Sequence, residues 1–349
     1  MSDLSKFGLV IQGPLTSSGL TGAGTRETFD CMPNILQLVN SHAAAFGEIV
    51  VSTWEDEDQG KLAILEAAGV RVIRNAPLTS EMSHAAKMRQ YVSTLSGIEA
   101  LSNGLDYVCK VRSDQSFDVA RFCVELLEAN SCYRDFLVLG RRGFIQGLFL
   151  SLRRPFGLSD FAIVGHLDEV RAFYIAQWGT DPVADPANDW VEGDAVKRFL
   201  LTLKNSLPIR DDVFFFPPLP RLLDRPVRES GVYGASESSF RLWETALRSV
   251  FSVSSREIMA DFRYRGHLLQ PSLQTYNGHR AEWQQLRLDF PAQLNSLVGE
   301  VVRVRPPLSW RLYRRGGAWT KLYWWLQTAK RTAALRRLRR LFSRWRSCL

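Results

Sequence analysis

The chain has 349 residues, of which 46% are hydrophobic, enough to build one large domain or two ordinary ones. No apolar run reaches the roughly 18 residues of a membrane span, and the apolar start at Phe7–Ile11 is too short for a signal peptide. The five cysteines are odd in number and form no Cys-x-x-Cys pair, which argues against a disulfide framework or zinc ribbon and favours a reducing cytosol.

The first 140 residues are predicted to alternate strands with helices. We expect strands at 7–11, 48–53, 70–74, 106–112 and 136–140. Helices are expected at 26–45, 60–68, 80–101 and 118–129, and a loop rich in Gly, Ser and Thr at 12–25. This alternation predicts a mostly parallel, Rossmann-type α/β sheet with helices on both faces.

The second half has a less regular pattern. Strands are predicted at 160–164 and 213–216, and helices at 168–177, 192–203 and 236–250. Residues 252–304 give mixed signals and no assignment. We expect residues 1–300 to form one domain with two halves, 1–140 and 141–300.

The stretch 106–115 carries the strongest chemical signal. Lys110 and Arg112 alternate with apolar residues, so both project from one face of the expected strand, and Asp114 follows at its carboxyl end. Ligands bind at that edge of open α/β sheets. A carboxylate beside two cations there suits a divalent metal, Mg²⁺ or Mn²⁺, holding a diphosphate. The alternative is a strand that ends in a solvated turn.

Other strand ends offer donor-binding candidates. The loop that begins with Gln12 and Gly13 either cradles phosphate or is simply flexible, and it matches neither common phosphate-binding motif. Thr53 and Trp54 could hold a base or ribose, or pack in the core. Arg89 is a candidate phosphate ligand, because a guanidinium makes bidentate contacts.

Three carboxylates lie close together in 189–194. Acids before a helix are favoured by its dipole, which would explain them structurally. A sugar hydroxyl also needs a carboxylate to accept its proton as it attacks, so Glu192 or Asp194 is the candidate catalytic base.

Taken in order, these landmarks resemble the WavE-type lipopolysaccharide-synthesis proteins, a family similar to GT-A glycosyltransferases. The matching segments are Val10–Pro14, Ser52–Trp54, Arg89–Gly97 and Lys110–Asp114. The resemblance covers roughly residues 7–200. It implies a GT-A-like fold and transfer of a sugar from a nucleotide-sugar donor to a glycolipid or polysaccharide acceptor. Residues 1–140 would then be the nucleotide-sugar-binding half and residues 141–300 the acceptor half.

The resemblance also implies roles for individual residues. Donor binding would fall to Gln12, Gly13, Thr53, Arg89, Lys110 and Arg112. Such enzymes hold a divalent metal with an Asp-x-Asp element. This chain keeps Asp114 in Ser113–Gln115, with Asp118 as the candidate second carboxylate.

The net charge of +8 is concentrated at the C-terminal end. Residues 301–349 hold 14 Arg and Lys and no Asp or Glu, so residues 1–300 have a net charge of −6. From Trp319 the spacing predicts a basic amphipathic helix with aromatic residues, typical of an anionic membrane surface, and we expect residues 317–349 to make that contact. Packing on the body is the second interpretation; nucleic-acid binding is the third and is not expected, because the body is acidic.

Two classes of function fit the sequence. The first is a cytoplasmic glycosyltransferase associated peripherally with the inner membrane. The second is a non-catalytic nucleotide-binding or scaffold protein of a polysaccharide-assembly complex, and the missing second carboxylate of the Asp114 element keeps it open.

Overall fold

The computed structural model describes residues 3–20, 26–78, 86–134, 137, 140–148, 150, 158–159, 161–178, 196, 199–200, 202–203, 243 and 246–268. Its centre is a seven-stranded sheet in the order β10-β8-β9-β6-β1-β4-β5. The strands are β1 (Phe7–Gln12), β4 (Glu48–Trp54), β5 (Arg71–Asn75), β6 (Tyr107–Arg112), β8 (Ile145–Gly147), β9 (Ile163–His166) and β10 (Phe251–Val253).

Neighbouring strands are parallel except at β9. β5, β4, β1 and β6 form a continuous parallel block, and β10 is parallel to β8. β9 lies antiparallel between β6 and β8. The structure therefore confirms the prediction of a mostly parallel, Rossmann-type α/β sheet.

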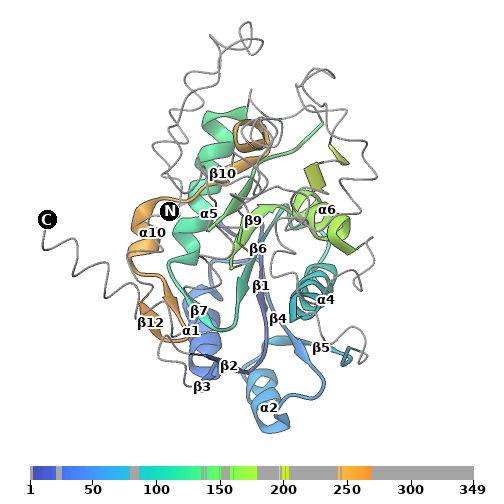
Figure 1. The fold of residues 1–349 in the computed structure, drawn as a ribbon, viewed down its shortest axis with the longest axis vertical. Coiled ribbons are helices and arrows are strands. Elements are labelled where there is room, and N and C mark those ends of the chain that lie inside the picture. Colours follow the sequence, from blue (N-terminus) through green and yellow to red (C-terminus); the bar gives the residue numbers. More distant parts are fainter. Residues whose placement is uncertain are drawn as a thin grey trace, which may run out of the picture.

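Helices cover both faces of this sheet (Figure 1). They are α1 (Met32–His42), α2 (Gln59–Ala67), α4 (Ala86–Glu99), α5 (Val119–Cys132), α6 (Leu167–Trp178) and the short α10 (Arg256–Ala260). α4 contacts β1, β4 and β5, and it also packs on α6. Gly97 allows this close approach, because a Cβ there would clash with the Val10 side chain.

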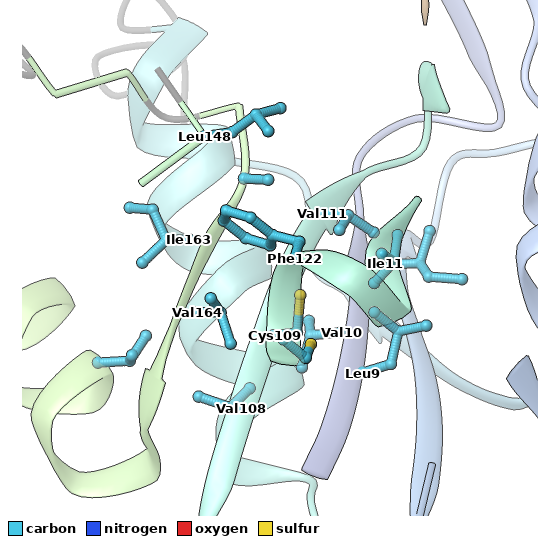
Figure 2. Close-up of a cluster of buried hydrophobic side chains, with 14 of the residues drawn as sticks. Leu9, Val10, Ile11, Val108, Cys109, Val111, Phe122, Leu148, Ile163 and Val164 are labelled. Atoms are coloured by element: carbon cyan, nitrogen blue, oxygen red, sulfur yellow. The ribbon is translucent and has the colours of Figure 1, made fainter. Parts of the chain in front are cut away.

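The core lies between β1, β6, β9 and α5 (Figure 2). Residues that alternate along β1 and β6 face opposite sides of the sheet, so Cys109 and Val111 face one way while Lys110 and Arg112 face the other. Phe122 of α5 is fully buried within the core, as are Cys109 and Val111. This packing fixes the position of the β6 carboxyl end.

The predicted loop at 12–25 and the predicted helix start at 26 are wrong. β2 (Thr16–Leu20) pairs antiparallel with β3 (Arg26–Asp30) to form a separate two-stranded sheet. The helix begins only at Met32, with Pro33 in its first turn. Proline is tolerated at that position, because its missing N–H has no partner in the first turn, so Pro33 starts the helix rather than interrupting it.

The region 252–304, which had no assignment, supplies part of the fold. β7 (Gln115–Ser116), β11 (Arg263–Tyr264) and β12 (His267–Leu268) form a three-stranded antiparallel sheet. The predicted strand at 160–164 and the predicted helix at 168–177 are confirmed as β9 and α6, with shifted ends.

Several predictions fall outside the described residues. These are the strand at 213–216, the carboxylates at 189–194, the tail from 301 and the domain boundary at 300; most of the strand at 136–140 also falls there. Within the part of the chain that is described, no helix has the length and apolar character needed to cross a bilayer.

Candidate functional site

The order of strands reverses at β1. β4 and β5 follow β1 along the chain and lie on one side of it, whereas β6 lies on the other side. Gln12 and Arg112 end β1 and β6, and the two residues are paired in register. Ligands bind outside the carboxyl ends of strands at such a switch point. The candidate site is therefore built around these two residues.

The chain segments that leave β1 and β6 are tied together. The Ser113 N–H donates to Gln12 O at 2.8 Å, and Ser113 Oγ donates to Pro14 O at 2.7 Å. Gly13 has φ +134°, and a Cβ there would lie 2.6 Å from Ser113 Oγ. Glycine is required at this position both for the backbone angle and for the close approach.

Asn34 of α1 holds the segment after β6 from the other side. Its Nδ2 lies 2.7 Å from Ser113 O and 2.5 Å from Gln115 O. Gln115 then pairs with Tyr264 across β7 and β11. The two connections bring the β11–β12 turn against Asp114, although 151 residues separate Arg265 from it in sequence.

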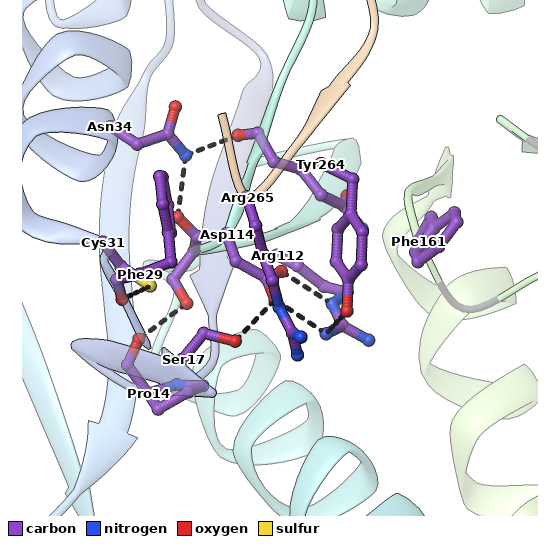
Figure 3. A network of polar contacts seen from close by, with 12 residues as sticks. Pro14, Ser17, Phe29, Cys31, Asn34, Arg112, Asp114, Phe161, Tyr264 and Arg265 are labelled. Atoms are coloured by element: carbon purple, nitrogen blue, oxygen red, sulfur yellow. Dashed lines mark hydrogen bonds and ion pairs between the residues drawn. The ribbon is translucent and has the colours of Figure 1, made fainter. Parts of the chain in front are cut away.

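Asp114 is the centre of a polar network (Figure 3). Arg112 donates to its carboxylate through Nε to Oδ1 and through Nη2 to Oδ2, each at 3.0 Å. Ser17 Oγ donates to Oδ2 at 3.0 Å, and Arg265 Nε lies 3.4 Å from the same oxygen. The Asp114 side chain is only 1% exposed, so these contacts replace its hydration.

The network keeps Asp114 ionised at neutral pH. Burial alone would raise its pKa, but the charge and hydrogen bonds of Arg112, the hydrogen bond from Ser17 and the charge of Arg265 outweigh it. The pKa of Asp114 is therefore held below the ordinary carboxyl value. As a carboxylate it accepts hydrogen bonds and fixes both guanidiniums.

Aromatic rings lie beside both arginines. The Arg112 guanidinium carbon is 5.6 Å from the Phe161 ring centroid and 5.5 Å from that of Tyr264. Arg265 lies 4.8 Å from the Tyr264 centroid. Cation–π contacts of this kind restrict the guanidiniums to defined orientations at the sheet edge.

Arg265 has an unfavourable backbone conformation. Its φ is +52° and that of Gly266 is +77°, which makes these residues the two central positions of the β11–β12 turn. A left-handed conformation costs a non-glycine residue about 1–2 kcal/mol. The Arg265 N–H donates to Asp114 O at 2.8 Å, which helps to hold this conformation.

The two predicted metal ligands do not fit a divalent cation as the structure has them. Both Asp114 oxygens accept hydrogen bonds from Arg112, and one of them also contacts Ser17 and Arg265. Asp118 is exposed and caps α5, accepting the Arg121 N–H at 2.9 Å. Within the described ranges, no group of three or more His, Cys, Asp or Glu residues could hold a metal.

The predicted donor-binding residues divide into two groups. Gln12, Gly13 and Arg112 lie together at the switch point. Lys110 precedes Arg112 by two residues in β6, so it lies on the same face of the sheet, and it is fully buried. Thr53 is the second-last residue of β4 and lies on the opposite face, because it alternates with Ser52, which pairs with Gln12. Gln12 Oε1 and Thr53 Oγ1 are buried and accept or donate no hydrogen bond within the described residues.

Arg89 and Trp54 are brought together. α4 runs from the carboxyl edge of the sheet back to its amino edge, since it connects β5 to β6. Its first turn therefore lies at the carboxyl edge, where the Arg89 guanidinium carbon is 5.4 Å from the Trp54 ring centroid. Arg89 is exposed, and Trp54 is buried. This pair adds a further cation, Arg89, to the edge on the α4 side.

The predicted catalytic bases, Glu192 and Asp194, lie outside the described residues. A carboxyl group that the sequence did not single out is Glu57, after β4. Burial raises its pKa and the Asp56 charge adds to this, while the Leu15 backbone, Lys61 and Arg89 act against it. The pKa of Glu57 is therefore raised above the ordinary carboxyl value, whereas that of Asp114 is lowered below it.

Cys31 lies close to this network but does not act as a nucleophile. Burial, with the Asp114 charge adding to it, raises the pKa of Cys31 to about 11. The thiol stays protonated at neutral pH and is inert.

The sequence did not identify Ser17, Phe161, Tyr264 or Arg265 as site residues. Ser17 was assigned to a loop, and Phe161 was treated only as part of a strand. Tyr264 and Arg265 lie where no element was predicted. An Arg-Gly pair between short β-prone stretches is a weak hairpin signal and could have located the last two.

Comparison with known proteins finds only a distant structural likeness. No protein-family model and no curated protein matches the chain. Among solved structures, 12 chains match it. One is 4-diphosphocytidyl-2C-methyl-D-erythritol synthase from Anaerococcus prevotii, at 14% identity, covering 50% of this chain and 77% of that one with a TM-score of 0.31. A likeness this distant carries no argument about function.

Proposed function

We propose that this chain is a glycosyltransferase that moves a sugar from a nucleotide-sugar donor to a lipopolysaccharide or lipid-linked polysaccharide acceptor. The observation that carries the proposal is the convergence of Gln12, Arg112 and Arg265 at the switch point of a mostly parallel sheet. Counted in chain order within the sheet, its strands run 3-2-1-4-6-5-7 with the sixth antiparallel. This order fits the GT-A-like class that the sequence resembles.

The arrangement suits the charge that develops during glycosyl transfer. The bond between the anomeric carbon and a diphosphate oxygen breaks, and its electron pair stays with the diphosphate. Fixed guanidiniums near that oxygen stabilise the growing negative charge. The acceptor oxygen bonds to the anomeric carbon, and its proton passes to a carboxylate, for which the proposal keeps Glu192 or Asp194.

The second candidate is a nucleotide-binding scaffold without catalysis. The observation that favours it is the full engagement of Asp114 by Arg112, Ser17 and Arg265. A binding module needs no general base and no metal, so it is compatible with every described contact of the site.

A panel of nucleotide sugars separates the two candidates. Thermal unfolding of the full chain is measured with each donor, and the release of free nucleotide is then followed over time. Stabilisation by one donor together with turnover supports the transferase. Stabilisation without turnover on any acceptor supports the scaffold, and no stabilisation by any donor contradicts both.

Arg89→Ala tests whether the α4 side belongs to the site. Loss of a charge-assisted hydrogen bond to phosphate is expected to weaken donor binding about 10- to 100-fold. Arg171→Ala is the matched control, since Arg171 is also an exposed helical arginine and pairs with Glu99 at the far end of α4. Equal affinities of the two variants would remove Arg89 from the site.

The proposed location is the cytoplasmic surface of the inner membrane, through residues 317–349. Replacing Arg336, Arg337, Arg339 and Arg340 by Gln in the full chain is expected to reduce flotation with anionic liposomes, because each cation contributes about 1 kcal/mol near such a surface. Liposomes of neutral lipid are the control. Unchanged flotation of the variant would contradict the membrane role.

A further inference from the structure

Two guanidiniums meet at one carboxylate at the switch point. Asp114 engages Arg112 through Nε and Nη2 but engages Arg265 only through Nε. The two terminal nitrogens of Arg265 donate no hydrogen bond to any residue in the described ranges, and its side chain is 23% exposed. Arg265 therefore has donors left over after it has paired with Asp114.

The backbone at Arg265 points to a functional reason for this residue. The first central position of such a turn favours Asn, Asp or Gly, all of which tolerate positive φ better than arginine does. The chain has arginine there, with φ +52°, and both its N–H and its Nε contact Asp114. Strained residues of this kind are concentrated at ligand-binding sites.

A third, independent feature lies beside Arg112. Gln12 is 3% exposed, and its Oε1 has no hydrogen-bond partner among the described residues. A carbonyl oxygen repels phosphate but accepts a hydrogen bond from a hydroxyl group. The strand end thus combines cationic donors with a buried acceptor, which matches the phosphates and the hydroxyls of a nucleotide or sugar.

We propose that Arg112 and Arg265 form a metal-independent binding site for the diphosphate of a nucleoside diphosphate or nucleotide sugar. Asp114 is then a positioning residue that holds the two guanidiniums, and it does not touch the ligand. The inference rests on the proposed function and specifies how its site binds the donor. The diphosphate site at Arg112 and Arg265 is proposed instead of the metal site predicted at Asp114 and Asp118.

The physical reason is charge. A divalent cation at Asp114 would have to displace two guanidiniums from a buried carboxylate, and both would then repel it. A diphosphate instead meets donors that are already oriented by Asp114 and by the rings of Phe161 and Tyr264. Planar guanidiniums bind phosphate oxygens in pairs, which gives both affinity and orientation.

Isothermal titration of the full chain with UDP, GDP, CDP and ADP tests the proposal. Each titration is run once with excess EDTA and once with excess Mn²⁺. At least one nucleotide is expected to bind with the same affinity, within about twofold, in both conditions. Binding that appears only with Mn²⁺ would overturn the proposal.

Arg265→Gly removes the guanidinium while suiting the positive φ, so the turn is expected to stay folded. Affinity for the nucleotide should fall about 10- to 100-fold. Arg263→Ala is the matched control, because Arg263 lies in the same hairpin and is exposed, and within the described residues its side chain donates only to the Gly266 carbonyl. An Arg265→Gly variant that binds as tightly as Arg263→Ala would contradict the proposal.

Asp114→Asn distinguishes a positioning residue from a metal ligand. The amide keeps an acceptor oxygen for Arg112 but loses the charge that holds both guanidiniums, so affinity for the nucleotide is expected to fall by the same factor with EDTA and with Mn²⁺. A metal site predicts loss of Mn²⁺-dependent binding instead. Wild-type protein that binds and turns over a nucleotide sugar only with Mn²⁺ would defeat this inference alone. No binding of any nucleotide under either condition would defeat the proposed function as well.

Discussion

Clusters of arginines and carboxylates lie at both the carboxyl and the amino ends of the strands of the central sheet. The two clusters differ in the sign of the charge that is buried. At the carboxyl edge the buried group is the Asp114 carboxylate, and the more exposed groups are Arg112 and Arg265 at 15% and 23%. At the amino edge the buried group is Arg141, 3% exposed, with the Glu169 carboxylate 2.9 Å away.

The amino edge is located by pairing, since His166 at the end of β9 lies opposite Tyr107 at the start of β6. Arg142 and Asp168 add an exposed pair there, at 3.2 Å. Burial, opposed by Glu169, lowers the pKa of Arg141 to about 10, still high enough to keep it charged at neutral pH. At the carboxyl edge the buried charge is thus a carboxylate with partly exposed arginines around it, as the proposed diphosphate site requires, whereas at the amino edge the buried charge is the Arg141 guanidinium.

The largest expected effect is at the amino edge. Glu169→Gln leaves the buried Arg141 guanidinium without a counter-charge, which is expected to cost about 3–5 kcal/mol of unfolding free energy. Urea unfolding measures this. Arg142→Ala removes the exposed pair with Asp168 and a contact with His166 Nε2, and should cost about 0–1 kcal/mol. Similar losses in the two variants would show that Arg141 is not buried as described.

An intermediate loss of stability is expected when glycines with positive φ at the two edges are replaced by alanine. Gly13 and Gly104 have φ +134° and +107°, but only at Gly13 would a Cβ meet a neighbouring atom. Gly13→Ala should therefore cost about 1–3 kcal/mol more than Gly104→Ala, because of overpacking against Ser113. Thermal unfolding compares them, and equal shifts would contradict the close approach at the switch point.

The smallest expected effect is the pH dependence of the stability that Asp114 contributes. The pKa of Asp114 is lowered by folding, so its ion pairs contribute fully above the unfolded value of about 3.9. That contribution is lost as the pH falls through the lower folded pKa. The stability difference between wild type and Asp114→Asn should be constant near neutral pH and should shrink below about pH 4. A difference that does not change with pH would contradict the ion pairing of Asp114.

The parallel block was predictable from the sequence because β1, β4 and β6 contain short apolar runs and the expected strands alternate with helical patterns. β1, β4, β5 and β6 were all placed within a residue or two of their observed bounds. β2 and β3 were missed because polar residues such as Ser17, Ser18 and Glu27 gave no apolar alternation, and a separate two-stranded sheet depends on pairing rather than on burial.

The candidate site was predictable only in part. Gln12, Arg112 and Asp114 were found because they follow apolar strands, and the ends of parallel strands meet at one edge. That Asp114 would pair with Arg265 could not be foreseen, since the contact spans 151 residues and depends on β7 pairing with β11. The local sequence pattern shows that a carboxylate is present at a strand end, but it does not show which charged residue pairs with that carboxylate.

Cys31, between β3 and α1, has a practical consequence for experiments on the site. Among the cysteines of the described ranges, Cys132 is exposed and Cys31, Cys109 and Cys123 are buried. Because the cysteine thiolate is the nucleophile that attacks a maleimide, the reagent should tag Cys132 in the native state and reach Cys31 only when the chain around it opens. With Cys132 replaced by Ser, and with Cys348, which lies outside the described ranges, replaced as well, the rate of Cys31 modification would report in real time how often the region beside Asp114 opens.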